Sequence, residues 1–506
     1  MRRAQDRLKI AAAALALLCA GLALLFATSS SLLYATNFWT DTNIYFTIGR
    51  GITRGLMPYR DLFDHKGPLL YLLFALGARI SDASFIGVFL LEVASLAAAL
   101  YWGWKTVRLY GDGPLTLTAI PVGAVVSTAC AAFTQGGSAE EFCLPALALA
   151  LFCTLRRLRE GTSCAAWRQL YLAFGAAMGW VFAIKYTDCG LFFGLGLMLL
   201  CWELWTLGLR RALAAARFMA AGFLLALVPL EGWLIARGAL SDCVRVYFIQ
   251  NIFEYVGEPL TPAGHIVNAL AYLRTQSAAN PAVAALAALG CLWTAAAALA
   301  RREKGFAFEA LAVPLGAGLL LLFAYWGELA HPYYALVFAS LSPLGLIPLG
   351  ALAGRVRGRA AAALAVVAAL AVAPACRALC LAAPLLDVRR EDMAQSVFAQ
   401  ILRGEEDATL LDVTSLDQGF YLAAGAIPTV RYFADNNLNT REKEEAIAGY
   451  LAQGKTRFVV TCYRDVGDRY ELIAEHTSPF DLNVPRTYKL YRRVGGAQED
   501  ADGQTH

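Results

Sequence analysis

The sequence contains few charged residues. Only 16% of its 506 residues are Asp, Glu, Lys or Arg, whereas 58% are hydrophobic. Soluble domains carry roughly 25% charged residues, so this composition excludes a large soluble protein. The net charge of +4 comes from basic residues clustered at the ends of apolar stretches. It therefore reports membrane topology and does not predict nucleic-acid binding.

The sequence also lacks the patterns of metal and disulfide sites. Its five histidines are scattered along the chain, which does not predict a zinc site. The twelve cysteines form no CxxC pair, and most lie in apolar segments, where a free thiol behaves as a small hydrophobic group. The chain has no internal repeat, which disfavours a transporter built from inverted repeats.

Long apolar runs fill the first three quarters of the chain. Runs of about 18 to 22 residues are long enough for a helix to cross about 30 Å of hydrocarbon, and a backbone in lipid must satisfy its own hydrogen bonds. The first run follows a basic start and is too long for a cleaved signal peptide, so we expect a retained signal anchor. We predict an all-α polytopic membrane protein with about eleven transmembrane helices, at residues 10–34, 83–104, 114–133, 141–156, 168–186, 188–207, 214–236, 281–300, 308–326, 332–353 and 359–378.

Basic residues predict the orientation of these helices. With the N-terminus in the cytoplasm, every second connection carries a basic cluster, as the positive-inside rule requires. An odd number of crossings then places the C-terminus outside. The inner clusters are Lys105 and Arg108; Arg156, Arg157, Arg159 and Arg168; Arg210, Arg211 and Arg217; Arg301, Arg302 and Lys304; and Arg355, Arg357 and Arg359.

Two long outer loops and a polar tail complete the predicted organisation. The loops span residues 35–82 and 237–280. The tail alternates strand-like runs at Thr409–Val413, Arg457–Tyr463 and Thr487–Arg493 with a helical pattern over Thr440–Gln453. We therefore expect a transmembrane domain over residues 1–384 and a small extracytoplasmic α/β domain over residues 385–506.

The first outer loop breaks the charge rule. It carries Arg50, Arg54, Arg60 and Lys66, although an outer loop should be poor in cations. An anionic ligand at the membrane surface, such as a lipid phosphate or pyrophosphate, would explain this excess. The alternative is an interfacial helix over Asn43–Arg54 whose arginines touch ordinary lipid headgroups.

The same loop resembles a known family. The order Asp41, Tyr45, Gly55–Asp61 (with Pro58 and Tyr59) and Lys66–Leu69 is similar to the first loop of bacterial GT-C fold glycosyltransferases. These family 39-like enzymes include the protein O-mannosyltransferase-like group and the lipid A aminoarabinose transferase. The resemblance spans roughly residues 36–160 and continues as general hydropathy to about 380.

What the resemblance implies is a transferase of the bacterial cytoplasmic membrane. It would move a sugar, with inversion, from a polyprenyl-phosphate donor to a hydroxyl of a lipid, glycan or protein acceptor on the outer face. Asp41 matches the family's general base, and the alternative is a helix N-cap. Relatives often carry two adjacent acidic residues here, whereas Thr42 follows Asp41. This difference favours a reaction without an obligatory cofactor. The participation of a divalent cation stays an open alternative.

The resemblance also implies roles for other residues. Lys66 matches a lysine held against the donor phosphate, with a snorkelling lysine as the alternative. Arg60 and Arg54 are weaker candidates for the same anion. Glu140 and Glu141 begin an apolar helix, where the macrodipole favours carboxylates; in relatives an acidic residue here faces the active-site cavity. Further cavity candidates are Tyr59, His65, Lys185, His331 and Tyr333.

Some of these candidates have plainer explanations. Lys185 could pair with Asp188 at the interface, and His65 could be a turn residue. His331 and Tyr333 could belong to an aromatic interface belt. Loop 237–280 could form a lid over the substrate.

Three other classes compete with the transferase. A flippase of lipid-linked saccharides would carry more mid-helix charge than Glu92, Glu203 and Glu231 provide. A polysaccharide polymerase or ligase would concentrate paired arginines in late loops, whereas this chain concentrates its cations in the first. A membrane scaffold would not need such a charged first loop. Membrane lipids are partners in every case.

Overall fold

The structure is a computed structural model of the chain. It describes residues 2–255, 260–327, 331–352, 355–356, 358–405, 407–481 and 484–495. Arg357 of the predicted inner basic clusters lies outside the described residues. So do the C-terminal end of the tail domain, from residue 496, and the last residue of the predicted 332–353 helix.

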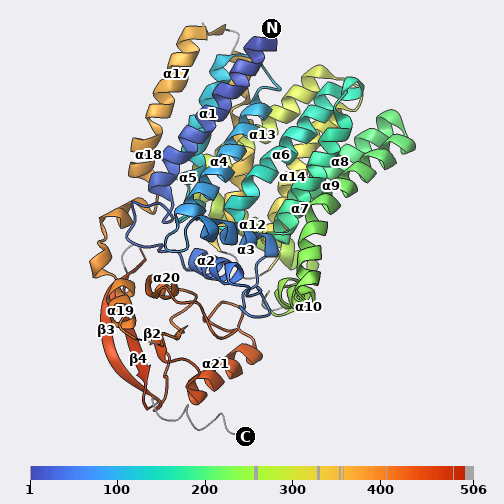
Figure 1. Cartoon of the computed structure of the whole chain (residues 1–506). Coiled ribbons are helices and arrows are strands. Elements are labelled where there is room, and N and C mark those ends of the chain that lie inside the picture. Colours follow the sequence, from blue (N-terminus) through green and yellow to red (C-terminus); the bar gives the residue numbers. More distant parts are fainter. Residues whose placement is uncertain are drawn as a thin grey trace.

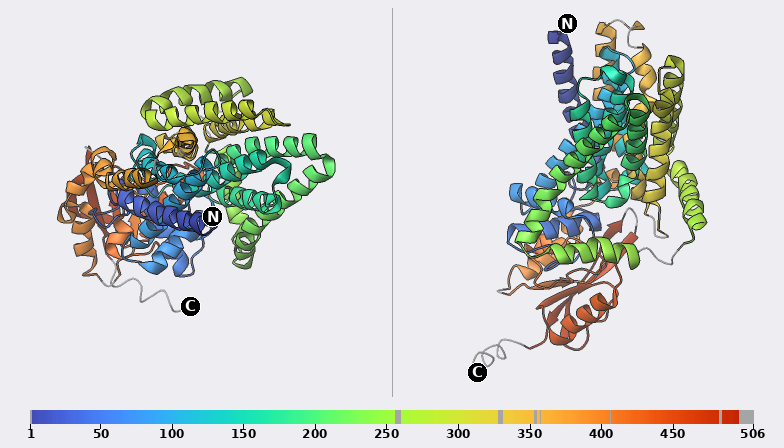
Figure 2. Two further views of the ribbon diagram at one scale, coloured as in Figure 1. Left: turned by 90° about the horizontal axis from the view of Figure 1, so that it is seen from above. Right: turned by 90° about the vertical axis from the view of Figure 1, so that its right-hand side faces the viewer.

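A bundle of helices forms the larger part of the molecule, with the tail at one end of it and the N-terminus at the other (Figures 1 and 2). The bundle helices are α1 (Arg2–Ala27), α4 (Ile86–Val107), α5 (Ala119–Thr128), α6 (Ala139–Glu160), α7 (Trp167–Phe182), α8 (Gly190–Leu207), α9 (Leu209–Ala236), α13 (Pro281–Arg301), α14 (Phe306–Ala324), α17 (Gly358–Leu370) and α18 (Val372–Leu379). Shorter pieces join or extend them: η1 (Pro114–Thr118), η2 (Ala131–Phe133), η3 (Gly161–Ser163), η4 (Tyr186–Cys189), η6 (Pro332–Leu341), α15 (Ser342–Gly345) and α16 (Ile347–Leu352).

Small residues allow these helices to pack closely. A Cβ atom added at Gly175 of α7 would lie 1.9 Å from the backbone oxygen of Met219 in α9, and one added at Gly222 of α9 would lie 2.0 Å from that of Leu172. Helices without side chains at a crossing can bring their backbones together, and dispersion then favours the contact even in lipid.

All eleven predicted transmembrane ranges contain helix, but not every helix is a candidate span. Within the described residues, eight helical stretches are long and apolar enough to cross a membrane. The predicted ranges 114–133, 141–156 and 168–186 are not among them. Their helices are short, as in α5 and α7, or begin and end with charged residues, as in α6. The first predicted range was also too long, since α1 ends at Ala27 instead of reaching residue 34.

A layer of short helices lies between the bundle and the tail (Figure 1). It contains α2 (Thr40–Thr53) and α3 (Pro68–Ile80) from the first predicted outer loop. The second predicted loop adds α10 (Leu240–Cys243), the π-helix η5 (Val244–Gln250) and α11 (Asn251–Phe253). Its longer helix α12 (Pro262–Ala279) lies against α13 and α14 of the bundle. The expected helix over Asn43–Arg54 is therefore present as α2, and eleven of its residues are buried.

The tail is a small α/β unit. Its four strands, β1 (Leu410–Asp412), β2 (Phe458–Thr461), β3 (Tyr470–Asp481) and β4 (Val484–Arg493), form one sheet in the order β1-β2-β4-β3. Only the β1–β2 pair is parallel. The helical elements of this region are η8 (Ala383–Asp387), η9 (Arg390–Asp392), α19 (Ala394–Leu402), α20 (Phe420–Ala424) and α21 (Arg441–Gln453). Three strands and α21 fall where the sequence predicts them.

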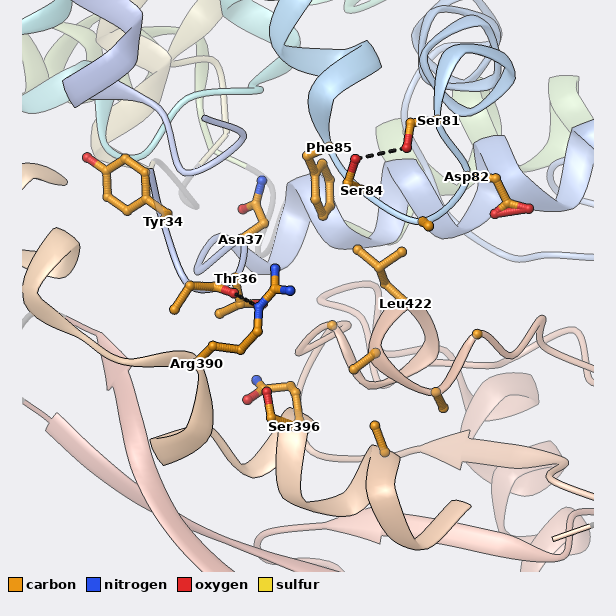
Figure 3. A pocket seen from close by; sticks show the side chains of 18 of the residues that line it. Tyr34, Thr36, Asn37, Ser81, Asp82, Ser84, Phe85, Arg390, Ser396 and Leu422 are labelled. Atoms are coloured by element: carbon orange, nitrogen blue, oxygen red, sulfur yellow. Dashed lines mark hydrogen bonds between the residues drawn. The ribbon is translucent and has the colours of Figure 1, made fainter. Parts of the chain in front are cut away.

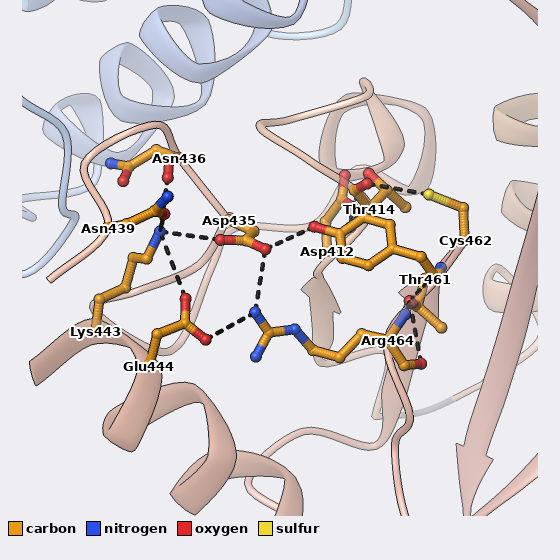
Figure 4. A network of polar contacts seen from close by, with 11 residues as sticks. Asp412, Thr414, Asp435, Asn436, Asn439, Lys443, Glu444, Thr461, Cys462 and Arg464 are labelled. Atoms are coloured by element: carbon orange, nitrogen blue, oxygen red, sulfur yellow. Dashed lines mark hydrogen bonds and ion pairs between the residues drawn. The ribbon is translucent and has the colours of Figure 1, made fainter. Parts of the chain in front are cut away.

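A polar network holds α21 against the sheet (Figure 4). Asp435 accepts hydrogen bonds from Tyr463 at 2.6 Å, from the buried Lys443 at 2.9 Å and from Arg464 at 3.1 Å. Although burial opposes ionisation, these donors keep the pKa of Asp435 below its usual value. Charged groups buried in this way stabilise a fold only when they are fully paired.

The tail is attached to the first-loop helix α2. The Thr47 hydroxyl donates to the Asp417 carboxylate at 2.6 Å. Arg50, 2% exposed, donates to the backbone oxygens of Tyr421 at 3.3 Å and Ala426 at 3.0 Å. One side of α2 is thus fixed by the tail, and its other side faces the bundle.

Candidate active site

Polar side chains from five separate segments converge where the bundle meets the layer of short helices. They come from the starts of α2 and α6, the loop before α3, the η4 turn and the start of η6. Each of these positions is a helix end or a turn, because a helix interior in lipid accommodates charge poorly.

Asp41 lies in the first turn of α2 and is 8% exposed. Its carboxylate accepts hydrogen bonds from the hydroxyls of Tyr45 at 3.3 Å and Tyr333 at 3.1 Å. The helix begins at Thr40, with Trp39 as an N-cap that makes no side-chain bond. The alternative reading of Asp41 as the N-cap is therefore wrong. Its carboxylate is held by tyrosines instead.

A buried charged group lies beside these tyrosines. Glu140 forms an ion pair with Lys185, whose ammonium also lies 3.4 Å from the centre of the Tyr334 ring. The suggested pairing of Lys185 with Asp188 is not what the structure shows. Asp188 is fully buried, and within the described residues only the Cys143 thiol is placed to hydrogen-bond its carboxylate.

Glu141 points elsewhere. Its carboxylate accepts from the Gly137 amide at 2.8 Å and lies against the buried Glu92, which in turn accepts from the Thr28 hydroxyl at 2.8 Å. Consecutive helical residues point about 100° apart. The structure therefore places Glu140 at the site and packs Glu141 against α4.

Lys66 lines a cavity of about 370 Å³. Its ammonium has no hydrogen bond or ion pair among the described residues. Gly67 fixes the loop here, because a Cβ at this position would lie 2.2 Å from the Ala183 backbone oxygen. The cavity is lined by His65, Lys66, Ile184, Lys185, Tyr186, Thr187, Tyr247, Asn251, Ile252, Tyr255, Phe323, Ala324, Trp326, Gly327 and Tyr334.

Buried groups support the Lys66 backbone. The Tyr71 hydroxyl donates to the Asp64 carboxylate at 2.7 Å and accepts from the Lys66 amide at 2.9 Å. Tyr59, fully buried in the left-handed region at φ 68°, donates to the Lys66 carbonyl at 2.7 Å. Burial raises the pKa of Asp64 to about 6, against the opposing effect of Tyr71 and Lys66. Tyr59 therefore positions Lys66 and does not line its cavity.

A chain of rings connects Asp41 to this cavity. His331 stacks on Tyr333 with ring centres 5.3 Å apart and lies 3.3 Å from the Tyr255 hydroxyl. Tyr255 packs edge-on against His65 at 4.8 Å. Burial lowers the pKa of both histidines, which keeps them neutral. The five candidates Asp41, His65, Lys66, His331 and Tyr333 are thus brought into one site.

Arg54 and Arg60 lie apart from that site. Arg54 pairs with Asp82 at 2.5 Å. Arg60 pairs with Asp61 at 2.8 Å and donates to the Arg237 carbonyl at 2.8 Å. Neither arginine lines the cavity of Lys66.

The described residues contain no group of three or more His, Cys, Asp or Glu side chains arranged to hold a metal ion. Whether the reaction needs a cation stays an open prediction.

The fold is shared with solved membrane enzymes. The chain is similar to ArnT from Cupriavidus metallidurans bound to undecaprenyl phosphate, with a TM-score of 0.60 and 13% identity over 95% of this chain and 97% of that one. The apo state of ArnT gives 0.58 and 14% over 96% and 98%. The chain has the GT-C fold. It is a multi-pass membrane protein with a C-terminal α/β unit, as the sequence predicts.

An archaeal oligosaccharyltransferase from Archaeoglobus fulgidus, solved with Zn and sulfate, also aligns, with a TM-score of 0.49 and 16% identity over 88% of this chain and 67% of that one. No family model and no curated protein sequence matches the chain. The assignment of the GT-C fold rests on the two ArnT structures.

Proposed function

We propose that this protein is a GT-C glycosyltransferase. It transfers a sugar from a polyprenyl-phosphate donor to an acceptor hydroxyl on the outer face of the bacterial cytoplasmic membrane. The observation that carries the proposal is Lys66, whose ammonium has no hydrogen bond or ion pair among the described residues and which lines a cavity that the ring chain joins to the Asp41 carboxylate. Within the described residues the half-buried Lys66 ammonium forms no ion pair, and an unpaired cation that lines a cavity favours an anionic ligand.

The donor phosphate is proposed to bind Lys66. The cavity of about 370 Å³ combines this ammonium with the apolar and aromatic side chains of Ile252, Phe323 and Trp326. Such a lining suits a phosphate attached to a prenyl chain. The solved ArnT structure with undecaprenyl phosphate supports this assignment by its overall fold.

Asp41 is proposed as the general base. In the reaction, the acceptor oxygen attacks the anomeric carbon while its proton passes to the Asp41 carboxylate. The bond between that carbon and the phosphate oxygen breaks, and polyprenyl phosphate leaves. Attack opposite the phosphate inverts the anomeric centre. Lys66 stabilises the charge that develops on the leaving phosphate, and Glu140 with Lys185 orients the acceptor.

The proposed topology places this site and the tail outside, with the N-terminus in the cytoplasm and a transmembrane domain over residues 1–384. The positive ends of α6, α9 and α13 support it, because Arg157 and Arg211 meet at Glu203, and Arg159 and Arg301 meet at Glu309. These basic clusters share one end of the bundle, as the positive-inside rule requires. A membrane-impermeant thiol reagent should label a cysteine at the exposed Arg441 in intact cells and spare one at Arg302.

A transfer assay tests the function. The purified full chain in lipid nanodiscs is incubated with a panel of radiolabelled polyprenyl-phosphate sugars and with lipid, glycan and peptide acceptors. We expect release of free polyprenyl phosphate that depends on one donor and one acceptor class. A flippase would move the intact donor across the bilayer without releasing it. A polymerase or ligase would extend or move a preformed glycan from a pyrophosphate. Either result would replace the proposal.

A further inference from the structure

A second cavity lies outside the site above. It measures about 980 Å³ and opens between the loop after α1, the turn between α3 and α4, and the tail (Figure 3). Tyr34 and Asn37 come from the first of these segments, Asp82 and Phe85 from the second, and Arg390 from the third. With Arg50 and Arg54 of α2, segments from the first 85 residues and from the tail thus build a single cleft.

The lining of this cleft is polar and positive. Four arginines face it, against the two acidic residues Asp82 and Glu391, and eight hydroxyl side chains and three amides complete the polar surface. Two of the arginines are available to a ligand. The Arg403 side chain has no hydrogen bond or ion pair within the described part of the chain, and the Arg390 side chain uses only Nε, which donates to the Ala35 carbonyl at 3.0 Å.

The other two arginines are already engaged. Arg50 is buried and donates to Asp82 and to tail carbonyls, while Arg54 pairs with the same Asp82. These bonds hold the walls of the cleft together and neutralise Asp82. The free positive charge therefore lies on the tail side of the cleft, at Arg390 and Arg403.

The cleft is separate from the donor cavity. Asp41 and Arg50 are nine residues apart in α2, and at about 100° per residue they point to opposite sides of the helix. Asp41 meets Tyr333 on the bundle side, whereas Arg50 meets the tail. No residue lines both cavities.

The cleft nevertheless ends near the proposed base. Asn37 lines it and lies four residues before Asp41. Its side chain accepts from the Trp39 amide at 3.0 Å, and its carbonyl accepts from Asn43 of α2 at 3.0 Å. An extended ligand in the cleft therefore lies against the segment that carries Asp41, around the N-terminus of α2.

We propose that this cleft binds the saccharide part of the acceptor, and that this saccharide carries anionic groups. The inference rests on the proposed transferase function. Hydroxyl and amide side chains match sugar hydroxyls, and the rings of Tyr34 and Phe85 offer apolar faces to sugar C–H groups. Arg390 and Arg403 match carboxylate or phosphate substituents, for which the guanidinium fork is suited.

Binding is measured without the transfer reaction. The full chain in detergent is titrated calorimetrically with penta-galacturonic acid, with neutral maltopentaose and with inorganic phosphate. The test variant is Arg390→Ala with Arg403→Ala. The matched control is Arg389→Ala with Arg441→Ala, which removes the same charge from exposed positions outside the cleft. We expect the charged pentasaccharide to bind at least about tenfold more tightly than the other two probes.

The test variant should lose that preference by about tenfold or more, while the control and Lys66→Ala stay within about twofold. Three outcomes would overturn the inference: no binding of the charged saccharide, equal loss in the control, or competition by undecaprenyl phosphate. Because these titrations need no donor, they can succeed where the transfer assay fails. If transfer is observed, the test variant should raise KM for the acceptor and leave kcat unchanged.

Discussion

Buried charges gather near both ends of α6, and the two groups differ in how they are satisfied. Near its last turn Arg157, 1% exposed, pairs with the fully buried Glu203 at 2.7 Å, and Tyr171 donates to the same carboxylate at 2.5 Å. Near its first turn, about 25 Å away along the helix, Glu140 pairs with Lys185. There, however, the Lys66 ammonium has no hydrogen bond or ion pair among the described residues. The Asp188 carboxylate has only the Cys143 thiol as a hydrogen-bond donor within the same residues.

This difference in pairing distinguishes a structural charge cluster, at the last turn of α6, from the candidate active site at its first turn. At the Arg157 end every buried charge meets an opposite charge, and the guanidinium also lies 4.3 Å from the Trp202 ring, so the cluster is complete without a ligand. At the Lys66 end, within the described residues, neither the Lys66 ammonium nor the Asp188 carboxylate forms an ion pair, although opposite charges lie nearby. Such groups cost free energy, and a ligand that pairs with them would recover it.

Asp41→Asn should give the largest effect. Asparagine can still accept hydrogen bonds from Tyr45 and Tyr333, but it cannot take a proton. We expect turnover to fall about 10²- to 10⁴-fold, with donor binding and melting temperature close to wild type. Steady-state transfer and thermal unfolding in detergent measure both. Asp112→Asn, at an exposed ion pair with Arg108, is the control. Near-normal turnover would remove Asp41 as the base and make Glu140 the next candidate.

Arg157→Met should show the opposite pattern. It leaves Glu203 buried with only the half-exposed Arg211 at 3.6 Å, and breaking a buried pair costs about 3–5 kcal/mol. We expect a lower unfolding temperature but an unchanged turnover per folded molecule. Adding Glu203→Gln should restore part of the stability, because the unpaired charge is gone. A stable but inactive Arg157→Met would contradict the division between the two ends.

The sequence predicts the fold well where local pattern decides it. Apolar length predicts the bundle helices, and the predicted helix over Asn43–Arg54 is present as α2. Strand β3 was missed, because its sequence is polar and contains Pro479. It lies at the edge of the sheet and pairs only with β4, where such residues are tolerated. The sequence predicts a loop where α12 lies, although Thr261 caps this helix.

The site was predicted less completely, because its contacts are long-range. Charge and resemblance pointed to Asp41 and Lys66, but Tyr71 carries no signal in the sequence, since its partner Asp64 lies across a turn. The choice between Glu140 and Glu141 depends on how α6 is rotated in the bundle. Arg54 and Arg60 shared the loop of Lys66 in the sequence, yet their partners lie elsewhere in the fold. Their proposed role in phosphate binding stays a prediction without support from the geometry.

Asp64→Asn should change how stability depends on pH. Burial raises the pKa of Asp64 to about 6, so the folded protein binds this proton more tightly than the unfolded chain does. Its contribution to stability is present below about pH 4 and is lost as the pH rises to about 6, by up to about 3 kcal/mol. The variant should flatten this slope in melting temperatures recorded between pH 4 and 7. The same slope in both proteins would assign it to another group.

Lys66→Ala should have the smallest effect and is the most direct probe of the unpaired end. A hydrogen bond to a charged group contributes about 1.5–3 kcal/mol, so affinity for undecaprenyl phosphate should fall about tenfold or more. Lys66→Arg should recover part of this affinity, because the charge is kept while the planar fork fits a lysine site poorly.

Lys455→Ala, which removes an exposed tail lysine, is the control. Binding is measured on the full chain in detergent at two salt concentrations, and the wild-type affinity should fall with salt more steeply than that of Lys66→Ala. Equal affinity and equal salt dependence in both proteins would show that Lys66 only anchors its loop at the membrane surface, and the contrast between the two ends of α6 would then have to rest on Asp188 alone.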